Sequence, residues 1–164
     1  MRVWQALALA SAMLTGGIEP TLTARCLIYV SVSEDFEKSD AVFAGKVIAE
    51  EYRPLKTPTE AVLSDLVVIP QGPAEVLTVR FAVEKWWKGG KSEEVTLHTS
   101  FIRYSEALSS SMAEDFRFSL GERYLVYAFK VSDNLRTSVC KRTKKLELVG
   151  EDLQKLGEGK APEK

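Results

Sequence analysis

Residues 121–143, GERYLVYAFKVSDNLRTSVCKRT, carry the clearest β pattern in the chain. Residues 124–129 place apolar or aromatic side chains at every position, so both faces of the predicted strand need cover. A strand that is covered on both sides lies in the centre of a sheet. Ser132, Asp133 and Asn134 are typical turn residues, and the chain then returns as a second strand that ends near Cys140. The stretch therefore predicts a hairpin at the centre of a small β domain.

Composition sets limits on the rest. The chain has 164 residues, of which 45% are hydrophobic and 27% are charged, which is enough for one domain with one core. The formal charge of −1 offers no basic surface for nucleic acid or an anionic membrane. With His98 as its single histidine, and without a phosphate-binding glycine loop or a metal-spaced cluster, the chain is expected to be no enzyme and to hold no metal or cofactor.

The amino end has the pattern of a secretory signal. A positive charge at Arg2 precedes the mostly apolar run 3–14, and small residues lead to Ala24. The run is shorter than the ~20 residues that span a bilayer. We therefore predict a signal peptide at residues 1–24, an extracytoplasmic (secreted or periplasmic) mature chain, and no stable membrane insertion after cleavage. A retained amino-terminal anchor is the alternative.

The two cysteines, Cys26 and Cys140, are 114 positions apart. Exported proteins form and keep disulfides, because their compartments are oxidising. Export thus predicts a bridge between these residues that ties the central hairpin to the mature amino end. Two unpaired buried thiols are the alternative.

In three further segments apolar and polar side chains alternate, which predicts half-buried strands at residues 40–50, 76–87 and 94–99. Gly45 interrupts the first, and a glycine inside a strand indicates a bend or the close approach of another backbone. A short helix is predicted before it, at residues 32–38, because Ser31 and Glu34 have the spacing of a capping box. In the third strand, His98 is expected to face solvent.

Residues 51–73 have a different composition, since five prolines and glycines bracket an apolar strip at 61–69. The segment is predicted to be an inserted arm between two core strands. Its strip is either a further strand of the sheet or a projecting contact surface. Residues 99–114 are rich in serine and are predicted to form a flexible surface loop.

The pair Trp86-Trp87 lies beside lysines, a combination that either packs in the fold or stacks on single-stranded nucleic acid. The formal charge of −1 favours packing. At the carboxyl end, apolar residues recur at helical spacing and predict a closing amphipathic helix that Gly157 ends: Leu146, Val149, Leu153 and Leu156. Residues 158–164 are predicted to be a flexible charged tail.

Five blocks in order carry a resemblance to a known family: SDAVFAGKV at 39–47, VEKWWKG at 83–89, GERYLVYA at 121–128, CKRT at 140–143 and DLQKLG at 152–157. In these blocks the chain resembles the netrin-like domain of the tissue inhibitors of metalloproteinases (TIMPs), in particular its bacterial secreted members. The resemblance covers residues 25–157. It implies a mainly β, five-stranded OB-fold barrel, with the predicted helices at its amino and carboxyl ends.

The resemblance also implies a function. In the animal inhibitors, the first residues of the mature chain bind the zinc of an endopeptidase, held by two disulfides. Here Cys140 matches a later family cysteine, and the bridge to Cys26 corresponds to the second family bridge. The first bridge has no cysteine in this chain, because Ala24 and the pair Glu114-Asp115 stand where it would attach.

Two functions follow as hypotheses. The first is a metalloendopeptidase inhibitor whose contact ridge is Arg25, Cys26 and Leu27, with residues 99–111 alongside and a zinc metalloprotease as its protein partner. The second is an exported OB-fold module that binds a protein through the insertion at 57–72, without inhibition.

Overall fold

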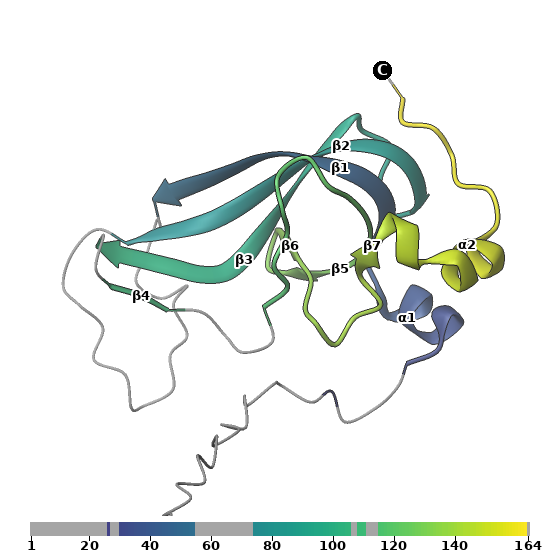
Figure 1. Cartoon of the computed structure of the whole chain (residues 1–164), viewed down its shortest axis with the longest axis horizontal. Coiled ribbons are helices and arrows are strands. Elements are labelled where there is room, and N and C mark those ends of the chain that lie inside the picture. The colour runs from purple at the N-terminus through teal and green to yellow at the C-terminus, as the bar shows by residue number, and fades with distance from the viewer. Residues whose placement is uncertain (1–25, 27–29, 55–73, 106–107, 111–114, 164) are drawn as a thin grey trace, which may run out of the picture.

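The computed structural model describes residues 26, 30–54, 74–105, 108–110 and 115–163 (Figure 1). Its elements follow one another as α1 (Val32–Lys38), β1 (Ala41–Pro54), β2 (Glu75–Lys88), β3 (Glu94–Ser105), β4 (Leu108–Ser110), β5 (Arg123–Val131), β6 (Asn134–Arg136), β7 (Lys144–Lys145), a 3₁₀ turn (Leu146–Leu148) and α2 (Gly150–Leu156). The prediction of a mainly β chain is confirmed. Among these described elements, no helix is long and apolar enough to cross a membrane.

The described strands form one sheet in the order β1-β2-β3-β6-β5-β7, with β4 beside β3. β1 also pairs with β5, so the pairings through β1, β2, β3, β6 and β5 return to the strand where they begin. Neighbours are antiparallel except β3 and β6, which are parallel and paired through Leu97 and Leu135. These five strands lie where the sequence predicted strands, whereas β4 and β7 are additional.

Strand β5 lies between two hydrophobic cores, as its two apolar faces predicted. Tyr124, Val126 and Ala128 pack into the first core, together with side chains of β1, β2 and β3. Leu125 and Tyr127 pack into the second core, beneath α1 and α2. Figure 1 shows both helices at the same end of the sheet, beside β5 and β7. The central strand thus joins the strand layer to the helix layer.

The helices form where local sequence signals predict them. Ser31 caps α1, because its hydroxyl accepts a hydrogen bond from the backbone N–H of Glu34 at 3.2 Å. The predicted apolar face of the closing helix packs in the second core, although its first turn is a 3₁₀ turn and α2 itself begins at Gly150. Gly157 ends α2 at a φ of +68°, with its N–H donating to the carbonyl of Leu153.

Trp86 and Trp87 both pack within the fold, as predicted for this pair. Trp86 is 4% exposed in the first core, and its indole N–H donates to the carbonyl of Ser92 at 2.9 Å. Trp87 packs against the second core, and its indole N–H donates to the carbonyl of Gly157 at 2.9 Å.

Two residues of the predicted tail at 158–164 bond to the end of β2 and the turn after it. Lys160 pairs with Trp86 through two backbone hydrogen bonds of 2.7 and 2.8 Å, and the N–H of Glu163 donates to the carbonyl of Lys91. The end of β2 has unpaired backbone groups at this edge, and the passing tail satisfies them. The charged composition of the tail gave no sign of this, because the bonds use only its backbone.

The predicted loop at 99–114 is also wrong over most of its length, because residues 99–105 continue β3 and 108–110 form β4. β2 begins at Glu75 and therefore provides backbone partners as far as Arg103. Thr99 is buried, and its hydroxyl donates to the carbonyl of Leu77 at 2.9 Å. Serine content thus indicates polarity here, while the length of the neighbouring strand decides the conformation.

The predicted arm at 51–73 begins later than expected, because residues 51–54 are the end of β1 and pair in register as far as Pro54 and Glu75. Residues 55–73, which include most of the arm and the 57–72 insertion, lie outside the described residues. The same holds for residues 1–24, where a signal peptide is predicted.

Close backbone approach occurs at two glycines. A Cβ on Gly45 would lie 2.8 Å from the carbonyl oxygen of Ala82, which agrees with the prediction for this strand. A Cβ on Gly89 would lie 2.0 Å from the carbonyl oxygen of Asp40, at a φ of +81°. Gly121 has the same φ of +81°, but its added Cβ would meet nothing within 4 Å.

Gly89 and Gly121 have the same φ, but only Gly89 has close neighbours. Replacing each with alanine therefore separates the cost of a steric clash from the cost of the left-handed backbone. We expect Gly121→Ala to lower the free energy of unfolding by about 1–2 kcal/mol, the cost of a left-handed backbone. Gly89→Ala should lower it by more than about 3 kcal/mol, because β1 and β2 must also move apart. Urea unfolding followed by tryptophan fluorescence measures both, and equal losses would contradict the close contact between Gly89 and Asp40.

Candidate functional site

The predicted ridge is described at one of its three residues. Cys26 is exposed and forms a disulfide with Cys140, with a Cα–Cα distance of 5.2 Å, so the predicted bridge is confirmed. Arg25 and Leu27 lie outside the described residues. Beside the bridge, the N–H of Cys140 donates to the hydroxyl of Ser138 at 3.3 Å, and Val139 is 41% exposed.

The two residues after Cys140 fix the amino-terminal segment to the sheet. The guanidinium of Arg142 donates to the carbonyl of Val30 at 3.1 Å, and its backbone N–H donates to the carboxylate of Asp35 at 2.7 Å. Lys141 donates to the other oxygen of Asp35 at 2.8 Å. Asp35 is 1% exposed and is thus a buried partner of the Lys141 ammonium and of the Arg142 backbone.

The other side of Arg142 contacts α2. Its Nε and Nη2 donate to the two carboxylate oxygens of Asp152, each at 2.8 Å, and the hydroxyl of Tyr127 donates to one of them at 2.9 Å. Arg142 is 5% exposed and Asp152 is 1% exposed. Two-point Arg–carboxylate pairs fix orientation as well as distance. We call Asp35, Tyr127, Lys141, Arg142 and Asp152 the buried polar network.

Sequence reasoning missed this network. Arg142 and Asp152 are 10 positions apart, while Arg142 and Asp35 are 107 apart, so no local spacing relates them. The only signal was that four of its five members, Tyr127, Lys141, Arg142 and Asp152, lie inside blocks of the family resemblance.

The network sets the ionisation of its members. Burial alone would raise the pKa of the Asp152 carboxyl, but the hydrogen bonds from Arg142 and Tyr127 outweigh burial and lower that pKa. Burial, together with the hydrogen bond to Asp152, raises the pKa of the Tyr127 hydroxyl. Asp152 is thus held as a carboxylate and Tyr127 as a neutral donor.

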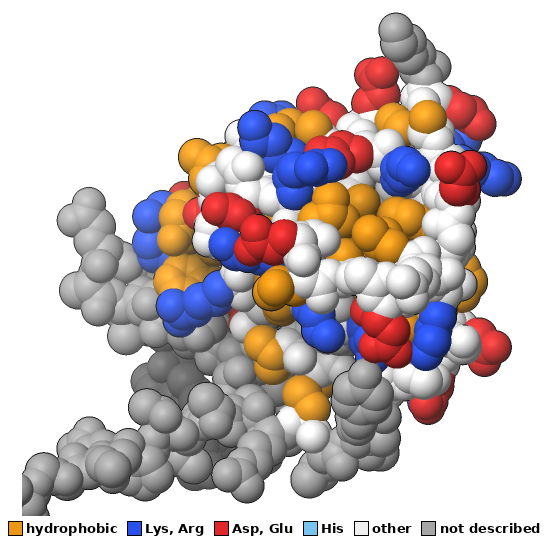
Figure 2. Space-filling model, turned by 45° about the vertical axis from the view of Figure 1, so that its right-hand side comes forward, with side chains coloured by type: hydrophobic (Ala, Val, Ile, Leu, Met, Phe, Trp, Pro, Cys, Tyr) orange, Lys and Arg blue, Asp and Glu red, His pale blue; other side chains and the backbone are white. Residues whose placement is uncertain are grey.

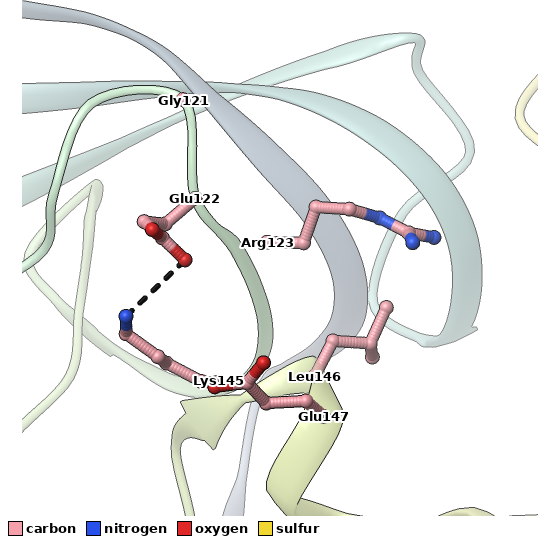
Figure 3. A pocket seen from close by; sticks show the side chains of 6 residues that line it. All are labelled: Gly121, Glu122, Arg123, Lys145, Leu146 and Glu147. Carbon is pink, nitrogen blue, oxygen red and sulfur yellow. Dashed lines mark ion pairs between the residues drawn. The ribbon is translucent and has the colours of Figure 1, made fainter.

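Surface charge elsewhere is mixed. On the face in Figure 2, Lys and Arg side chains are interspersed with Asp and Glu side chains around a hydrophobic patch. A hollow of about 220 Å³, drawn in Figure 3, is lined by Glu122, Arg123 and Lys145 among others. Lys145 pairs with Glu122 at 3.2 Å, and Arg123, which points away from that pair, binds Glu84. These charges already have partners, so the hollow offers little to a ligand.

An apolar hollow of about 200 Å³ opens at the end of the first core. It is lined mainly by Tyr52, Leu77, Phe101, Phe116 and Phe118. The rings of Phe116 and Phe118 meet Tyr124 edge-on, which closes the core behind the hollow. The hollow adjoins the core packing, and its lining also includes the polar residues Glu50, Thr99, Asp115 and Arg117.

A third hollow, which we call the outer pocket, has a volume of about 220 Å³. Its lining includes His98, Ser100, Asp115, Phe129, Val131 and Arg136. His98 was expected to be a solvated strand residue, but it is half-buried here. Thr137 and Ser138 complete the lining and place the pocket next to Cys140.

Asp115 accepts a hydrogen bond from the N–H of Ser100 at 3.2 Å. Burial raises the pKa of the Asp115 carboxyl, and Ser100, Arg136 and Arg117 offset this only in part. Within the described part of the chain, no group of three or more His, Cys, Asp or Glu side chains is placed to hold a metal ion.

The lowered pKa of Asp152 gives a pH prediction. Its carboxylate stabilises the fold above its ordinary pKa of 3.8, and this stabilisation is lost as pH falls through the lower folded value. We expect Asp152→Asn to cost about 3–5 kcal/mol at pH 7, because Arg142 is left buried without its anion. The difference from the parent protein should shrink below pH 3.8.

Urea unfolding between neutral and acid pH measures this difference. Glu34→Gln is the control, since Glu34 pairs with Lys38 on the exposed surface of α1 and its loss should hardly change stability. A cost of Asp152→Asn that stays constant with pH would contradict the ionised pair.

Compared with known proteins, the chain matches no family model and no curated protein.

Proposed function

We propose that the chain is an exported inhibitor of zinc metalloendopeptidases, built on a netrin- and TIMP-like OB-fold barrel. The observation that carries the proposal is the exposed Cys26, tied by a disulfide to a segment that the buried polar network fixes. The inhibitory ridge is Arg25, Cys26 and Leu27, and its partner is a zinc metalloprotease. The chain performs no catalytic step of its own.

The strand pairings support the fold in this proposal. The OB fold is a five-stranded, partly open Greek-key barrel. The five strands β1, β2, β3, β6 and β5 pair in a circuit, which a barrel of this kind requires. The weakest link of the circuit is the single pair of Leu97 and Leu135 between β3 and β6, where such a barrel opens.

The anchoring of the amino-terminal segment supports the activity. Cys26 is held by its bridge, Val30 by Arg142, and α1 by the contacts of Asp35. The bridge thus restricts the positions open to Cys26 before it meets a partner. Pre-organisation of this kind strengthens binding because less entropy is lost on association.

The family resemblance then suggests what the ridge does. In the animal inhibitors, the first amine and carbonyl of the mature chain displace water from the zinc of the protease. This chain lacks the first family bridge, and in the proposal the buried polar network takes over part of its anchoring role. Arg25, as the predicted first mature residue, supplies the amine and the carbonyl.

The second hypothesis, a non-inhibitory binding module, uses the insertion at 57–72. That segment lies outside the described residues, so this hypothesis stays a prediction. Deletion of residues 57–72 separates the two, because it removes the contact surface of the module and leaves the ridge in place.

The test is a panel of zinc endopeptidases assayed with mature protein that begins at Arg25. We expect at least one enzyme to be inhibited, and the inhibition constant to rise about 30-fold or more when the terminal amine is acetylated, as for a contact worth about 2 kcal/mol. The 57–72 deletion serves as the control and should inhibit as well as the parent protein. Inhibition that acetylation leaves unchanged, or no inhibition across the panel, would refute the proposed ridge.

A further inference from the structure

The outer pocket lies on the outward face of three neighbouring strands. Leu97 of β3, Ala128 of β5 and Leu135 of β6 pack in or against the first core. Side chains alternate along a strand, so the residues that follow them point outward. Those residues are His98, Phe129 and Arg136, and all three line the pocket.

Arg136 has a donor without an acceptor. Its Nε is buried and finds no hydrogen-bond partner among the described residues. The Nε of Arg80 also lacks a hydrogen bond, but it lies 3.8 Å from a carboxylate oxygen of Glu94. A buried donor that stays unpaired costs free energy, and a charged donor costs more. Arg136, which lines the pocket, therefore has hydrogen-bonding capacity that the described residues leave unused.

The two walls of the pocket differ in character. Phe129 and Val131 form an apolar wall on β5, and Val131 is 42% exposed. His98, Ser100 and Arg136 form a polar wall on β3 and β6. A side chain with an aliphatic stem and a carboxylate end matches both walls at once.

Asp115 is the one acidic residue that lines the pocket, and its position limits its competition for Arg136. Its Oδ1 accepts from the N–H of Ser100, and its interaction with Arg136 is a charge–charge attraction without an ion pair within 4.0 Å among the described residues. Burial raises the pKa of the Asp115 carboxyl, so a negative charge at this position costs more free energy than it does in water.

The pocket also adjoins the disulfide. Ser138 lines the pocket and accepts a hydrogen bond from Cys140, which is bonded to the exposed Cys26. A protein that contacts Cys26 would therefore lie near the pocket. Exposed Val139 lies between the two features in the sequence.

We propose that the outer pocket is a carboxylate subsite that receives a glutamate side chain of the protein partner. The carboxylate accepts from Arg136, and the stem of the glutamate lies against Phe129 and Val131. The identity of the partner rests on the proposed function, whereas the carboxylate preference rests on the pocket alone.

His98 is the only histidine in the chain, so its imidazole gives a single NMR signal from within the pocket. The probe is N-acetyl-glutamate α-amide, and the matched neutral probe is N-acetyl-glutamine α-amide. We expect a saturable shift of the His98 signal by the glutamate probe, with a dissociation constant on the order of millimolar for so small a ligand. The glutamine probe should give no saturable shift.

Variants test the role of the guanidinium. Arg136→Gln should abolish the saturable shift, and Arg136→Lys, which keeps the charge but loses the Nε donor, should weaken binding by about 10-fold. Arg80→Gln is the matched control and should bind as the parent protein does, since Arg80 lies outside the pocket. Circular dichroism verifies that each variant is folded; if Arg136→Gln does not fold, Arg136→Lys and the glutamine probe still decide.

An equal response to the two probes, or binding that survives Arg136→Gln, would overturn the subsite. The protease panel keeps this outcome separate from the proposed function. Binding of the glutamate probe without inhibition of any protease would support the subsite and refute the inhibitor proposal. Inhibition of a protease without binding of the glutamate probe would refute the subsite and support the inhibitor.

Discussion

The buried guanidinium of Arg142 is the interaction on which the rest of the structure depends. It meets the carboxylate of Asp152 with two hydrogen bonds and the carbonyl of Val30 with another, while its backbone binds Asp35. A cation this deeply buried is tolerated only when its partners are all in place. The amino-terminal segment, α1, β5 and α2 therefore pack together as one unit, and the second core closes beneath them.

The segment 137–143 links this unit to the outer surface. Thr143 and Arg142 face inward, where the hydroxyl of Thr143 accepts a hydrogen bond from the backbone of Tyr127 at 2.9 Å. Thr137 and Ser138 line the outer pocket, and Cys140 holds the exposed Cys26. One short segment thus contains Arg142 of the buried polar network, the disulfide partner of Cys26 and part of the lining of the proposed subsite.

The sequence predicted much of the fold but little of the candidate site. Alternation predicted three strands of the circuit, and the two-faced apolar run with its turn predicted the other two. The capping residue Ser31 predicted α1, and the expected export predicted the disulfide. The continuation of β3 beyond Thr99 was missed, because it depends on how far β2 extends beside it. The pairing of Lys160 with Trp86 was missed because it uses backbone groups alone. Arg136 was missed as well, because its neighbours in the pocket come from β3, β5 and residues outside the strands.

By itself, the sequence determined the mainly β class, the two-faced central strand, the helix starts and the two cysteines available for a bridge. Each of these follows from side-chain periodicity or from chemistry within a few residues, which a linear pattern records. Only the tertiary structure decided which charges are buried together and which outward side chains meet in one pocket. Those contacts join residues as far apart as Asp35 and Arg142, and their energies depend on burial and geometry that exist only after the chain has folded.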